Sequence, residues 1–547
     1  MKINDIKSVY GVLPQCGALI QIVGQDSVRT LFLQGLSASA APVFFSTIAG
    51  ELCKTVVFIL QDADEAGYFY HDLTQIMGQD DVLFFPSSYR RAVKYGQRDA
   101  ASEILRTEVL SRLSRRKTEK QSSLYIVSCP EAVSELVVSK KRLDERTLIL
   151  SAGQTVDLVG VQRTLREFGF SEVDYVYEPG QFAVRGSIMD VYSFSSEWPF
   201  RVDFFGNEID TIRTFEVQDQ LSRDKRDTVE IVPELSRTTD EKMPFTSFLP
   251  SDTILVVKDM TYLRDTVSQI YKDGFSSQAV TERLEGATEA EQDQIMRDMR
   301  RENQLVSGTR FAEETEAFRR IEIGHKPAGT PDATIKFNIT PQPLFHKNFD
   351  LLTRSLEDYR LMGYKLYIFA DSEKQTKRLR DIFDSEEIKA RDYDIKFEPV
   401  DKTLHEGFAD NDLHVCFFTD HQIFDRFHKY SLRSDTARSG KMALTMKELQ
   451  EMEPGDFIVH VDFGIGKFGG LVRVPAGDSY KEAIRIIYQH GDIVDVSIHS
   501  LYKISKYRRN GAGDPPRLST LGPGAWDRVK ARPMKRRKDI ARALIKL

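Results

Sequence analysis

Residues 177–222 of the chain read YEPGQFAVRGSIMDVYSFSSEWPFRVDFFGNEIDTIRTFEVQDQLS. Apolar residues recur at every second position along 182–188 and again at 202–204, which predicts two half-buried β-strands. Gly206-Asn207 separates the second run from a further β-rich run and predicts a two-residue hairpin turn. The opposite strand face carries the charged residues Arg185, Arg201, Asp203, Glu208, Asp210 and Arg213. The stretch therefore predicts a small antiparallel sheet with one charged face, either solvated surface or a docking face.

The order of residues in this stretch resembles a known module. EPGQFAVRG at 178–186 and RVDFFGNEID at 201–210 are similar to the inserted domain that the excision-repair protein UvrB shares with the transcription-repair coupling factors, the Mfd family. In both families this module docks onto the damage-recognition ATPase UvrA. The resemblance implies that Arg185, Arg201 and Phe205 occupy the positions that contact UvrA.

The same three residues are physically suited to a contact site. Arginine makes bidentate hydrogen bonds, and an aromatic ring can fill a pocket on the partner. Phe205 directly follows Phe204, and successive side chains of a strand point to opposite faces, so one of the two must face solvent. Whether Phe205 is exposed or belongs to the core stays open at this point.

Composition limits the class of protein. The chain has 547 residues, enough for about three to five domains. Its formal net charge of −6 does not favour a protein that coats nucleic acid. It contains no run of 18 apolar residues and does not open with a signal-peptide pattern, so we expect a cytoplasmic protein without a membrane partner.

The cysteines are interpreted as small core residues of a reducing compartment. They are far apart in the sequence, and none is in CxxC spacing. We therefore predict neither disulfides nor a metal site. The four residues are Cys16, Cys53, Cys129 and Cys416.

The N-terminal region reads as an α/β unit with a degenerate phosphate loop. Strands are predicted at 30–33, 55–60, 82–85 and 124–128, with a helix over 99–113. The first strand runs into QGLSASAAP at 34–42, the place where a nucleotide-binding protein carries GxxxxGK[ST].

The substitutions in this loop remove its chemistry. Gly35 is kept, but the second glycine is Ala40, the lysine is Ala41 and the hydroxyl residue is Pro42. Without the lysine nothing reaches the β/γ-phosphates, without the hydroxyl nothing holds Mg²⁺, and proline removes an N–H donor. We predict a P-loop-shaped turn that cannot hydrolyse ATP and binds no cofactor. This favours the Mfd family, which carries a dead loop here, over UvrB, whose loop is intact.

A second recognisable module lies near the C-terminus. EPGDFIVHVDFGIGKFGGL at 453–471 opens a compact β unit, with further strands at 483–488 and 493–498. Five short strands in about 55 residues predict an SH3- or Tudor-like barrel. His460, Asp462 and His490 are interpreted as exposed polar residues rather than metal ligands.

This unit is similar to the RNA-polymerase-interacting domain of Mfd, which is shared with CarD-type transcription regulators. The resemblance implies contact with the β subunit of the polymerase, centred on Val474 and surrounded by Leu471, Arg473 and Lys467. Pairing through an open strand edge is the expected physical mode, because such an edge offers unpaired backbone groups.

The chain as a whole is predicted to be a multi-domain α/β protein. A degenerate helicase-like domain carries an inserted α+β domain, and a small α/β spacer, the barrel and a basic linker helix follow. The inserted domain includes a strand at 147–150 and a helix at 159–168. The returning part of the degenerate domain is expected to hold buried strands at 253–257 and 333–338 and a polar helix at 276–301. The spacer is expected to hold helices at 351–362 and 373–383, a strand at 365–369 and a flexible linker at 431–441, and the barrel a kink at Gly469-Gly470. The predicted bounds are 1–130 with 218–347 for the degenerate domain, 131–217 for the insert, 348–446 for the spacer, 447–514 for the barrel and 515–547 for the helix.

The resemblance to Mfd implies an N-terminal fragment, without the translocase motor, of a protein about twice as long. In this hypothesis the fragment is a non-catalytic, monomeric scaffold that binds stalled RNA polymerase and recruits UvrA. ATP, Mg²⁺ and most DNA contacts would belong to the missing motor. Two alternatives stay open: a UvrB-like ATP-dependent damage-loading protein, and a CarD-like transcription regulator acting through the barrel alone.

Overall fold

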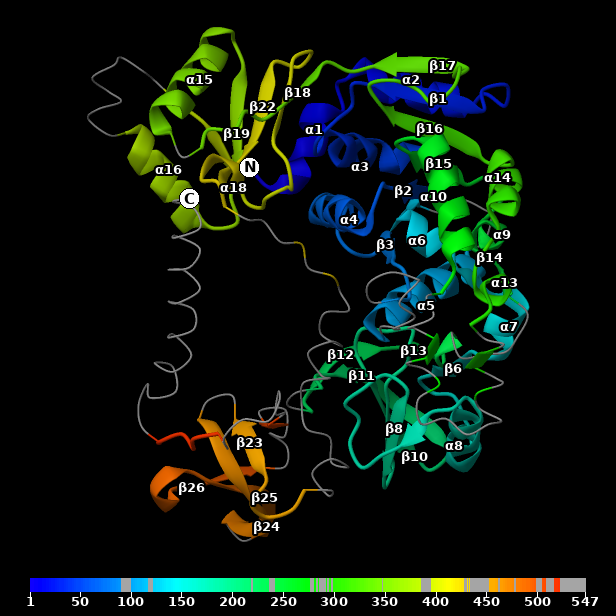
Figure 1. Cartoon of the computed structure of the whole chain (residues 1–547), viewed down its shortest axis with the longest axis vertical. Coiled ribbons are helices and arrows are strands. Elements are labelled where there is room, and N and C mark those ends of the chain that lie inside the picture. The colour runs from blue at the N-terminus through cyan, green and yellow to red at the C-terminus, as the bar shows by residue number, and fades with distance from the viewer. Residues whose placement is uncertain are drawn as a thin grey trace. The chain divides into compact units, whose positions relative to one another are not determined.

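The computed structural model shows a mixed α/β protein with several sheets, as the sequence predicts. The chain divides into two compact units, Met1–Glu145 with Leu235–Arg433, and Arg146–Glu234 with Ser434–Leu547. Each unit is described by itself (Figure 1). The described residues are 1–89, 100–116, 122–217, 220–235, 242–275, 299–346, 348–384, 395–426, 452–460, 463–476, 479–497, 504–507 and 516–521, with 280, 281, 284, 292, 295, 296, 430 and 432.

The first unit is built on a seven-stranded sheet in the order β17-β1-β16-β15-β2-β4-β3, and all its neighbouring strands run parallel. Helices α3 and α4 lie on one side of the strands and α14 on the other (Figure 1). Strands covered on both faces need continuous apolar runs, and β2 (TVVFI) and β4 (LYIVS) are buried along their whole length. The strands are β1 (Thr30–Gln34), β2 (Thr55–Ile59), β3 (Val82–Phe85), β4 (Leu124–Ser128), β15 (Ile254–Val257), β16 (Arg319–Gly324) and β17 (Ala333–Lys336).

Helices and one small strand pair complete this part of the unit. Strands β5 (Leu136–Val138) and β14 (Lys242–Pro244) pair antiparallel. The helices are η1 (Ile3–Asp5), α1 (Ile6–Tyr10), α2 (Pro14–Val23), α3 (Ala40–Leu52), α4 (Ala63–Met77), α5 (Ala100–Arg115), α6 (Pro130–Val133), α7 (Lys140–Glu145), α9 (Phe245–Phe248), α10 (Met260–Asp273), α13 (Arg301–Gln304) and α14 (Gly308–Glu316).

Most elements predicted for this region are found, and two points need correction. The four predicted strands correspond to β1–β4, and the helix over 99–113 corresponds to α5. The run at 333–338 is not a strand buried on both faces. Among the described strands β17 pairs with β1 alone, at the sheet edge, and Ile335 is the one buried residue of the strand, with Phe337 buried just beyond its end. Cys53 is exposed rather than in the core, because it follows the last turn of α3 at the surface with φ of 47°.

A second, five-stranded sheet belongs to the same unit, in the order β18-β21-β22-β19-β20. The predicted helices at 351–362 and 373–383 and strand at 365–369 correspond to α15, α16 and β19. The antiparallel strands β18, at the sheet edge, and β21, next to it, were not predicted. The elements are β18 (Ile339–Pro341), α15 (Phe349–Leu361), β19 (Lys365–Phe369), α16 (Glu373–Phe383), β20 (Glu398–Val400), β21 (Phe408–Asp410), β22 (Val415–Thr419) and α18 (Asp420–Ile423).

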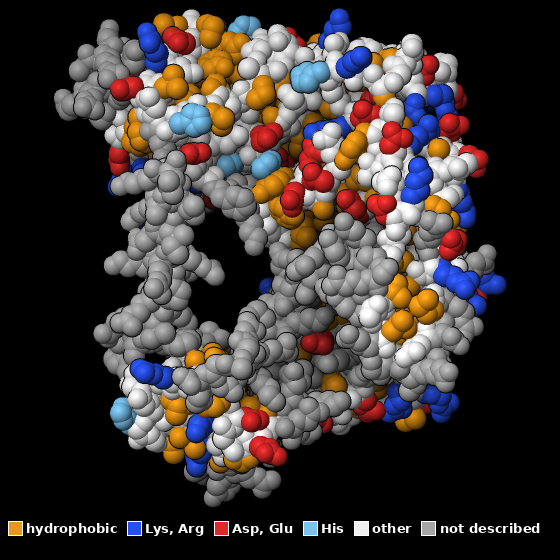
Figure 2. All heavy atoms as spheres, viewed as in Figure 1, with side chains coloured by type: hydrophobic (Ala, Val, Ile, Leu, Met, Phe, Trp, Pro, Cys, Tyr) orange, Lys and Arg blue, Asp and Glu red, His pale blue; other side chains and the backbone are white. Residues whose placement is uncertain are grey.

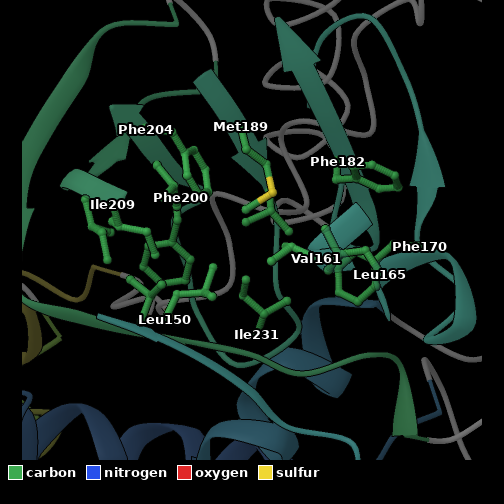
Figure 3. Close-up of a cluster of buried hydrophobic side chains, with 14 residues drawn as sticks. Leu150, Val161, Leu165, Phe170, Phe182, Met189, Phe200, Phe204, Ile209 and Ile231 are labelled. Carbon is green, nitrogen blue, oxygen red and sulfur yellow. The ribbon is translucent and has the colours of Figure 1, made fainter. Parts of the chain in front are cut away.

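The second unit contains a six-stranded sheet in the order β12-β11-β10-β9-β8-β7. The strands are β7 (Ser171–Glu172), β8 (Gln181–Arg185), β9 (Ile188–Val191), β10 (Phe200–Phe205), β11 (Glu208–Phe215) and β12 (Ser222–Arg226). Helix α8 (Leu158–Glu167) and the pair formed by β6 (Leu148–Ser151) and β13 (Thr228–Ile231) add further buried residues. Figure 3 shows Leu165 and Phe170 near Phe182, and Leu150 near Phe200, within one core cluster.

The structure corrects the prediction of one strand over 182–188. This run is the hairpin β8–β9, which turns at Gly186-Ser187, where Gly186 has φ of 63°. The turn holds two residues, so the side-chain phase reverses across it: Phe182 is opposite Val191, and Ile188 is opposite Arg185, on the face away from the core. The hairpin predicted at Gly206-Asn207 is confirmed, since Phe205 pairs with Glu208 across it.

The second unit also holds a five-stranded antiparallel sheet in the order β26-β25-β24-β23-β27. The predicted strands at 483–488 and 493–498 fall on β25 and β26. The elements are β23 (Phe457–His460), β24 (Gly464–Ala476), β25 (Ser479–Ile487), η4 (Gln489–Gly491), β26 (Ile493–Ser497) and β27 (Ile504–Lys506).

His460 is not the exposed residue that the alternation predicted. It is 2% exposed and lies on the same strand face as the buried Ile458, with its ring 4.7 Å from that of Phe463. The alternation was assigned with Val459 facing inward, whereas Ile458 and His460 are the buried residues of this strand and Val459 is half-buried. His490 is exposed. Asp462, the linker at 431–441 apart from Leu432, the helix expected from Trp526 and most of the polar helix expected at 276–301 lie outside the described residues.

Within the described part of the chain, no single helix has the length and apolar character needed to cross a membrane. Two helical segments taken together, Ile3–Tyr10 and Pro14–Val23, have the length and apolar composition of a membrane span, but they are bent by 81° relative to each other.

Candidate docking surfaces

The turn after β1 contains the predicted degenerate phosphate loop, Gly35–Pro42, and its residues make contacts within the protein. Gly35 has φ of 81°, and a Cβ there would lie 2.5 Å from the carbonyl oxygen of Phe337, so the position requires glycine. Helix α3 begins at Ala40, and Ala40, Ala41 and Pro42 are all buried. The three residues that replace the phosphate-binding chemistry therefore pack into the protein.

Residues His405 and Glu406 of the same unit lie against this turn. The backbone N–H of His405 donates to Asp72 Oδ1 at 2.8 Å, and that of Glu406 donates to Ser39 Oγ at 2.9 Å. Ser39 in turn donates to Asp72 Oδ2 at 2.5 Å, and the His405 ring stacks on Tyr68 with ring centres 3.6 Å apart. A cavity of about 640 Å³ adjoins this segment. The hydroxyl and carboxylate here bind backbone amides of the same unit.

Burial raises the pKa of Asp72 to about 8, against the opposing effect of the hydrogen bonds from Ser39 and His405. A raised folded-state pKa means that the folded protein binds this proton more tightly than the unfolded chain. Stability is therefore expected to fall as pH rises from about 4 to 8, by at most about 1.4 kcal/mol per pH unit. The variant Asp72→Asn should lack this contribution.

The measurement is urea unfolding of parent and Asp72→Asn at pH 6, 7 and 8. Two further groups at this segment titrate with shifted pKa values. Burial raises the pKa of Glu406 and lowers that of His421, whose ring contacts the carbonyl of His405. Both remain in the variant, so the difference between the two proteins isolates Asp72. Parallel curves would contradict the expectation.

The charged face of the six-stranded sheet is organised around Asp190. Strand register places Asp190 directly opposite Arg201, and Arg201 opposite Arg213. Arg185 lies on the same face, two residues from Ala183, which is opposite Asp190. The side chain of Asp190 is 0% exposed, whereas those of Arg185 and Arg201 are 33% and 15% exposed.

Both arginines bind this buried carboxylate. Arg201 is bidentate, with Nε 2.7 Å from Oδ1 and Nη2 2.9 Å from Oδ2 of Asp190. Arg185 also donates to Oδ2 through Nη2. The hydrogen bond to Asp190 raises the pKa of Arg201. The two predicted contact arginines are thus brought together, by a residue that the sequence analysis did not select.

The predicted charged face is only partly charged. Towards one end of the strands, a small apolar cluster covers this face. The two guanidinium groups lie over aromatic rings there: Arg201 is 4.6 Å from the ring centre of Phe215, and Arg185 is 4.8 Å from that of Tyr175. The buried members of this cluster are Val176, Tyr177, Ala183, Tyr192, Phe215 and Val217. Aromatic faces attract guanidinium groups, so the cluster helps to hold both arginines.

Phe205 lies at the tip of the β10–β11 hairpin and faces solvent. Its exposed fraction is 83%, whereas that of the preceding Phe204 is 5%. Phe204 packs into the core of the domain (Figure 3). The question that the sequence left open is therefore settled in favour of an exposed aromatic.

The residues expected to contact the polymerase lie along β24. The Lys467 ammonium is 5.5 Å from the ring centre of Phe457, Leu471 is 49% exposed, and Val474 is half-buried. The backbone of Arg473 pairs with Glu482 of β25. A register shift between Phe468 and Leu471 coincides with the kink predicted at the double glycine.

The second half of β24 has a free edge among the described strands. Strand β23 pairs with β24 only from Gly464 to Lys467, whereas β25 pairs with it as far as Ala476. The backbone beside Val474 therefore has one described strand partner, on the β25 side. This is the type of edge that strand addition requires.

The comparisons with known proteins match both regions. Residues 148–236 match the family model of the UvrB interaction domain, and residues 452–508 match that of the CarD-like/TRCF RID domain. The chain is 21% identical over 589 residues to the transcription-repair-coupling factor of Bacillus subtilis (strain 168), and 22% identical over 587 residues to that of Staphylococcus aureus (strain bovine RF122 / ET3-1). These matches cover 95% and 97% of the chain.

The matched part is 49% of each relative, so the chain spans about half the length of these proteins. The resemblance drawn from residues 178–210 and 453–471 is thereby confirmed. The chain therefore carries, in one sequence, a region similar to the UvrB interaction domain and a region similar to the CarD-like/TRCF RID domain, and it is similar along nearly all of its length to transcription-repair-coupling factors.

Proposed function

We propose that this chain is a docking scaffold that links stalled RNA polymerase to nucleotide excision repair. One module would bind UvrA, and the other would bind the β subunit of the polymerase. The observation that carries the proposal is the presence of both family matches in one chain whose relatives are named transcription-repair-coupling factors. A scaffold needs two separate recognition surfaces, and the two matches lie more than 200 residues apart.

The UvrA-binding residues of this proposal are Arg185, Arg201 and Phe205. Two anchored guanidinium groups and an exposed ring at a hairpin tip are the residue types that dominate binding energy in protein interfaces. At 83% exposure on the hairpin tip, the Phe205 ring is free of the core and available to fill a pocket on a partner. The exposed ring therefore supports a partner at this tip.

The polymerase-binding residues of this proposal are Val474, Leu471, Arg473 and Lys467, acting with the free edge of β24. We propose that the five strands close into an SH3- or Tudor-like barrel and that the polymerase adds a strand beside Val474. Such pairing takes its affinity from main-chain hydrogen bonds and its specificity from side chains such as the exposed Leu471.

The scaffold of this proposal has no ATPase activity and needs no cofactor. The loop at Gly35–Pro42 lacks lysine and a metal-binding hydroxyl, and Ser39 and Asp72 hold the amides of His405 and Glu406. In the whole protein, an ATP-driven DNA translocase would supply the motor, with ATP, Mg²⁺ and most DNA contacts. Figure 2 shows acidic, basic and apolar side chains interspersed on the visible face of the described residues, which does not favour a broad nucleic-acid surface on that face.

The test is a titration of the chain with purified UvrA, beside the variant Phe205→Ala. The parent is expected to bind, and the variant to bind about 30-fold more weakly, as for an interface residue worth about 2 kcal/mol. Val159→Ala is the matched control, because Val159 is an equally simple exposed apolar residue of the same domain, at 59% exposure on α8. It should bind UvrA like the parent.

Other results of this experiment would favour the alternatives. No binding of UvrA by the parent, together with retained binding of RNA polymerase, would favour a CarD-like regulator. A rise in melting temperature on adding ATP and Mg²⁺ would favour a UvrB-like ATP-dependent protein. Equal binding by parent and Phe205→Ala would remove the hairpin tip from the interface.

A further inference from the structure

The charged sheet face contains one group that no contact role explains, the carboxylate of Asp190. It is 0% exposed, so no partner protein can reach it without rearrangement. Burying a carboxylate is costly unless it is paired and hydrogen-bonded. Asp190 meets this requirement with three hydrogen bonds, two from Arg201 and one from Arg185.

Each arginine is held on further sides. Nη1 of Arg185 donates to the carbonyl of Asp174 at 2.7 Å, and Nη1 of Arg201 donates to that of Gln220 at 3.0 Å. The rings of Tyr175 and Phe215 lie against the two guanidinium groups. A free arginine side chain carries about 2 kcal/mol of rotamer entropy, which a partner would otherwise have to remove on binding. Here the fold has already removed much of that freedom.

The anchored groups keep hydrogen-bonding capacity. A guanidinium has five N–H donors, and the bonds to Asp190 and Asp174 use two of those of Arg185. Its side chain is 33% exposed. Arg185 can therefore donate to a partner while it stays bound to Asp190.

The charge of this face indicates the chemistry of the partner. The row of directly opposite residues across four strands is Asp190, Arg201, Arg213 and Lys225. It contains three cations and one carboxylate, and that carboxylate is buried. Asp203 on the same face is 21% exposed and already pairs with Arg213, so the cations of this row together with Arg185 outnumber its accessible carboxylate. Such a surface suits a partner that presents carboxylates.

We propose that Asp190 is the positioning residue of this docking face: it fixes Arg185 and Arg201 in the geometry that receives acidic side chains of UvrA. The inference rests on the proposed function and deepens it. Asp190 itself does not touch the partner. It acts through the two arginines, so its effect on binding should depend on them.

The variant that tests this is Asp190→Asn, which keeps the shape and removes the charge. An amide offers one acceptor oxygen in place of two and turns an NH₂ group towards an arginine donor. We expect at least a tenfold loss of UvrA affinity in a protein that keeps its circular-dichroism spectrum. Asp203→Asn is the matched control, because Asp203 lies on the same face and pairs with Arg213 but is 21% exposed. It should change affinity less than threefold.

A thermodynamic cycle separates positioning from a general structural role. Asp190→Asn is measured in the parent and in an Arg185→Gln background. If Asp190 acts through the arginines, its effect on affinity should shrink in the Arg185→Gln background. An equal effect in both backgrounds would overturn the proposal.

A second variant keeps the test decisive if Asp190→Asn does not fold. Arg201→Lys retains the positive charge but loses the bidentate fork, and should also lose about tenfold in affinity. If parent binding and the Phe205→Ala loss occur but both Asp190→Asn and Arg201→Lys bind like the parent, this inference fails while the proposed function stands. If the parent does not bind UvrA, the proposed function fails first.

Discussion

Replacing Glu135 with alanine is expected to lower the free energy of unfolding of the first unit by about 3–5 kcal/mol. Glu135 and Arg106 form an ion pair whose side chains are 5% and 6% exposed. Removing one partner of a buried pair leaves the other charge without compensation, which costs more than the pair itself contributes. Among the contacts that the described residues make with it, the Arg106 guanidinium would keep the carbonyls of Pro86 and Ala132 and the ring of Phe85.

The carboxylate of Glu135 also organises the chain after β3. It accepts hydrogen bonds from both hydroxyls of Ser87 and Ser88 at 2.6 Å and from the Ser88 amide at 3.0 Å. In Glu135→Ala these buried donors lose their acceptor, which adds to the cost.

The measurement is urea unfolding monitored by circular dichroism, with Glu145→Ala as the control. Glu145 also pairs with an arginine, Arg142, but its side chain is 43% exposed, and exposed pairs contribute about 0–1 kcal/mol. A loss below about 1 kcal/mol for Glu135→Ala would mean that water or another group replaces the carboxylate.

The sequence predicted those elements whose own residue pattern shows whether they are buried on one face or on both. Strand β2 is apolar at every position except its first, and only a strand buried on both faces suits such a run. Short strands carry weaker signals: β21 is three residues long, and β18, also three residues long, ends in a proline. Strand β18 pairs with β21, which lies far away in the sequence, so no local pattern predicts that pairing.

Prediction of the charged face succeeded for its exposed residues and missed its centre. The order of residues around Arg185, Arg201 and Phe205 carries the family resemblance. Asp190 was missed because the strand 182–188 was read through the turn at Gly186, and only the β9–β10 register brings Asp190 opposite Arg201. A two-residue turn read at Gly186-Ser187 would have placed Ile188 and Asp190 on the same face as Arg185.

The double variant Arg185→Ala/Arg201→Ala is expected to lose about 3–5 kcal/mol of stability as well as UvrA binding. It leaves the Asp190 carboxylate buried without the three hydrogen bonds that now satisfy it. A loss of binding in this variant would therefore mix two causes, lost contacts and a strained sheet. Melting the variant alone does not separate them.

Adding Asp190→Ala to the double variant is expected to restore at least about 1 kcal/mol, because the uncompensated charge disappears and apolar replacements of buried ionic groups are often neutral. Urea unfolding of the double and triple variants measures this difference. If the triple variant is the less stable of the two, Asp190 contributes more through packing than its charge costs. If stability returns and UvrA binding does not, the binding loss belongs to the arginines, because the sheet that carries them has been repaired.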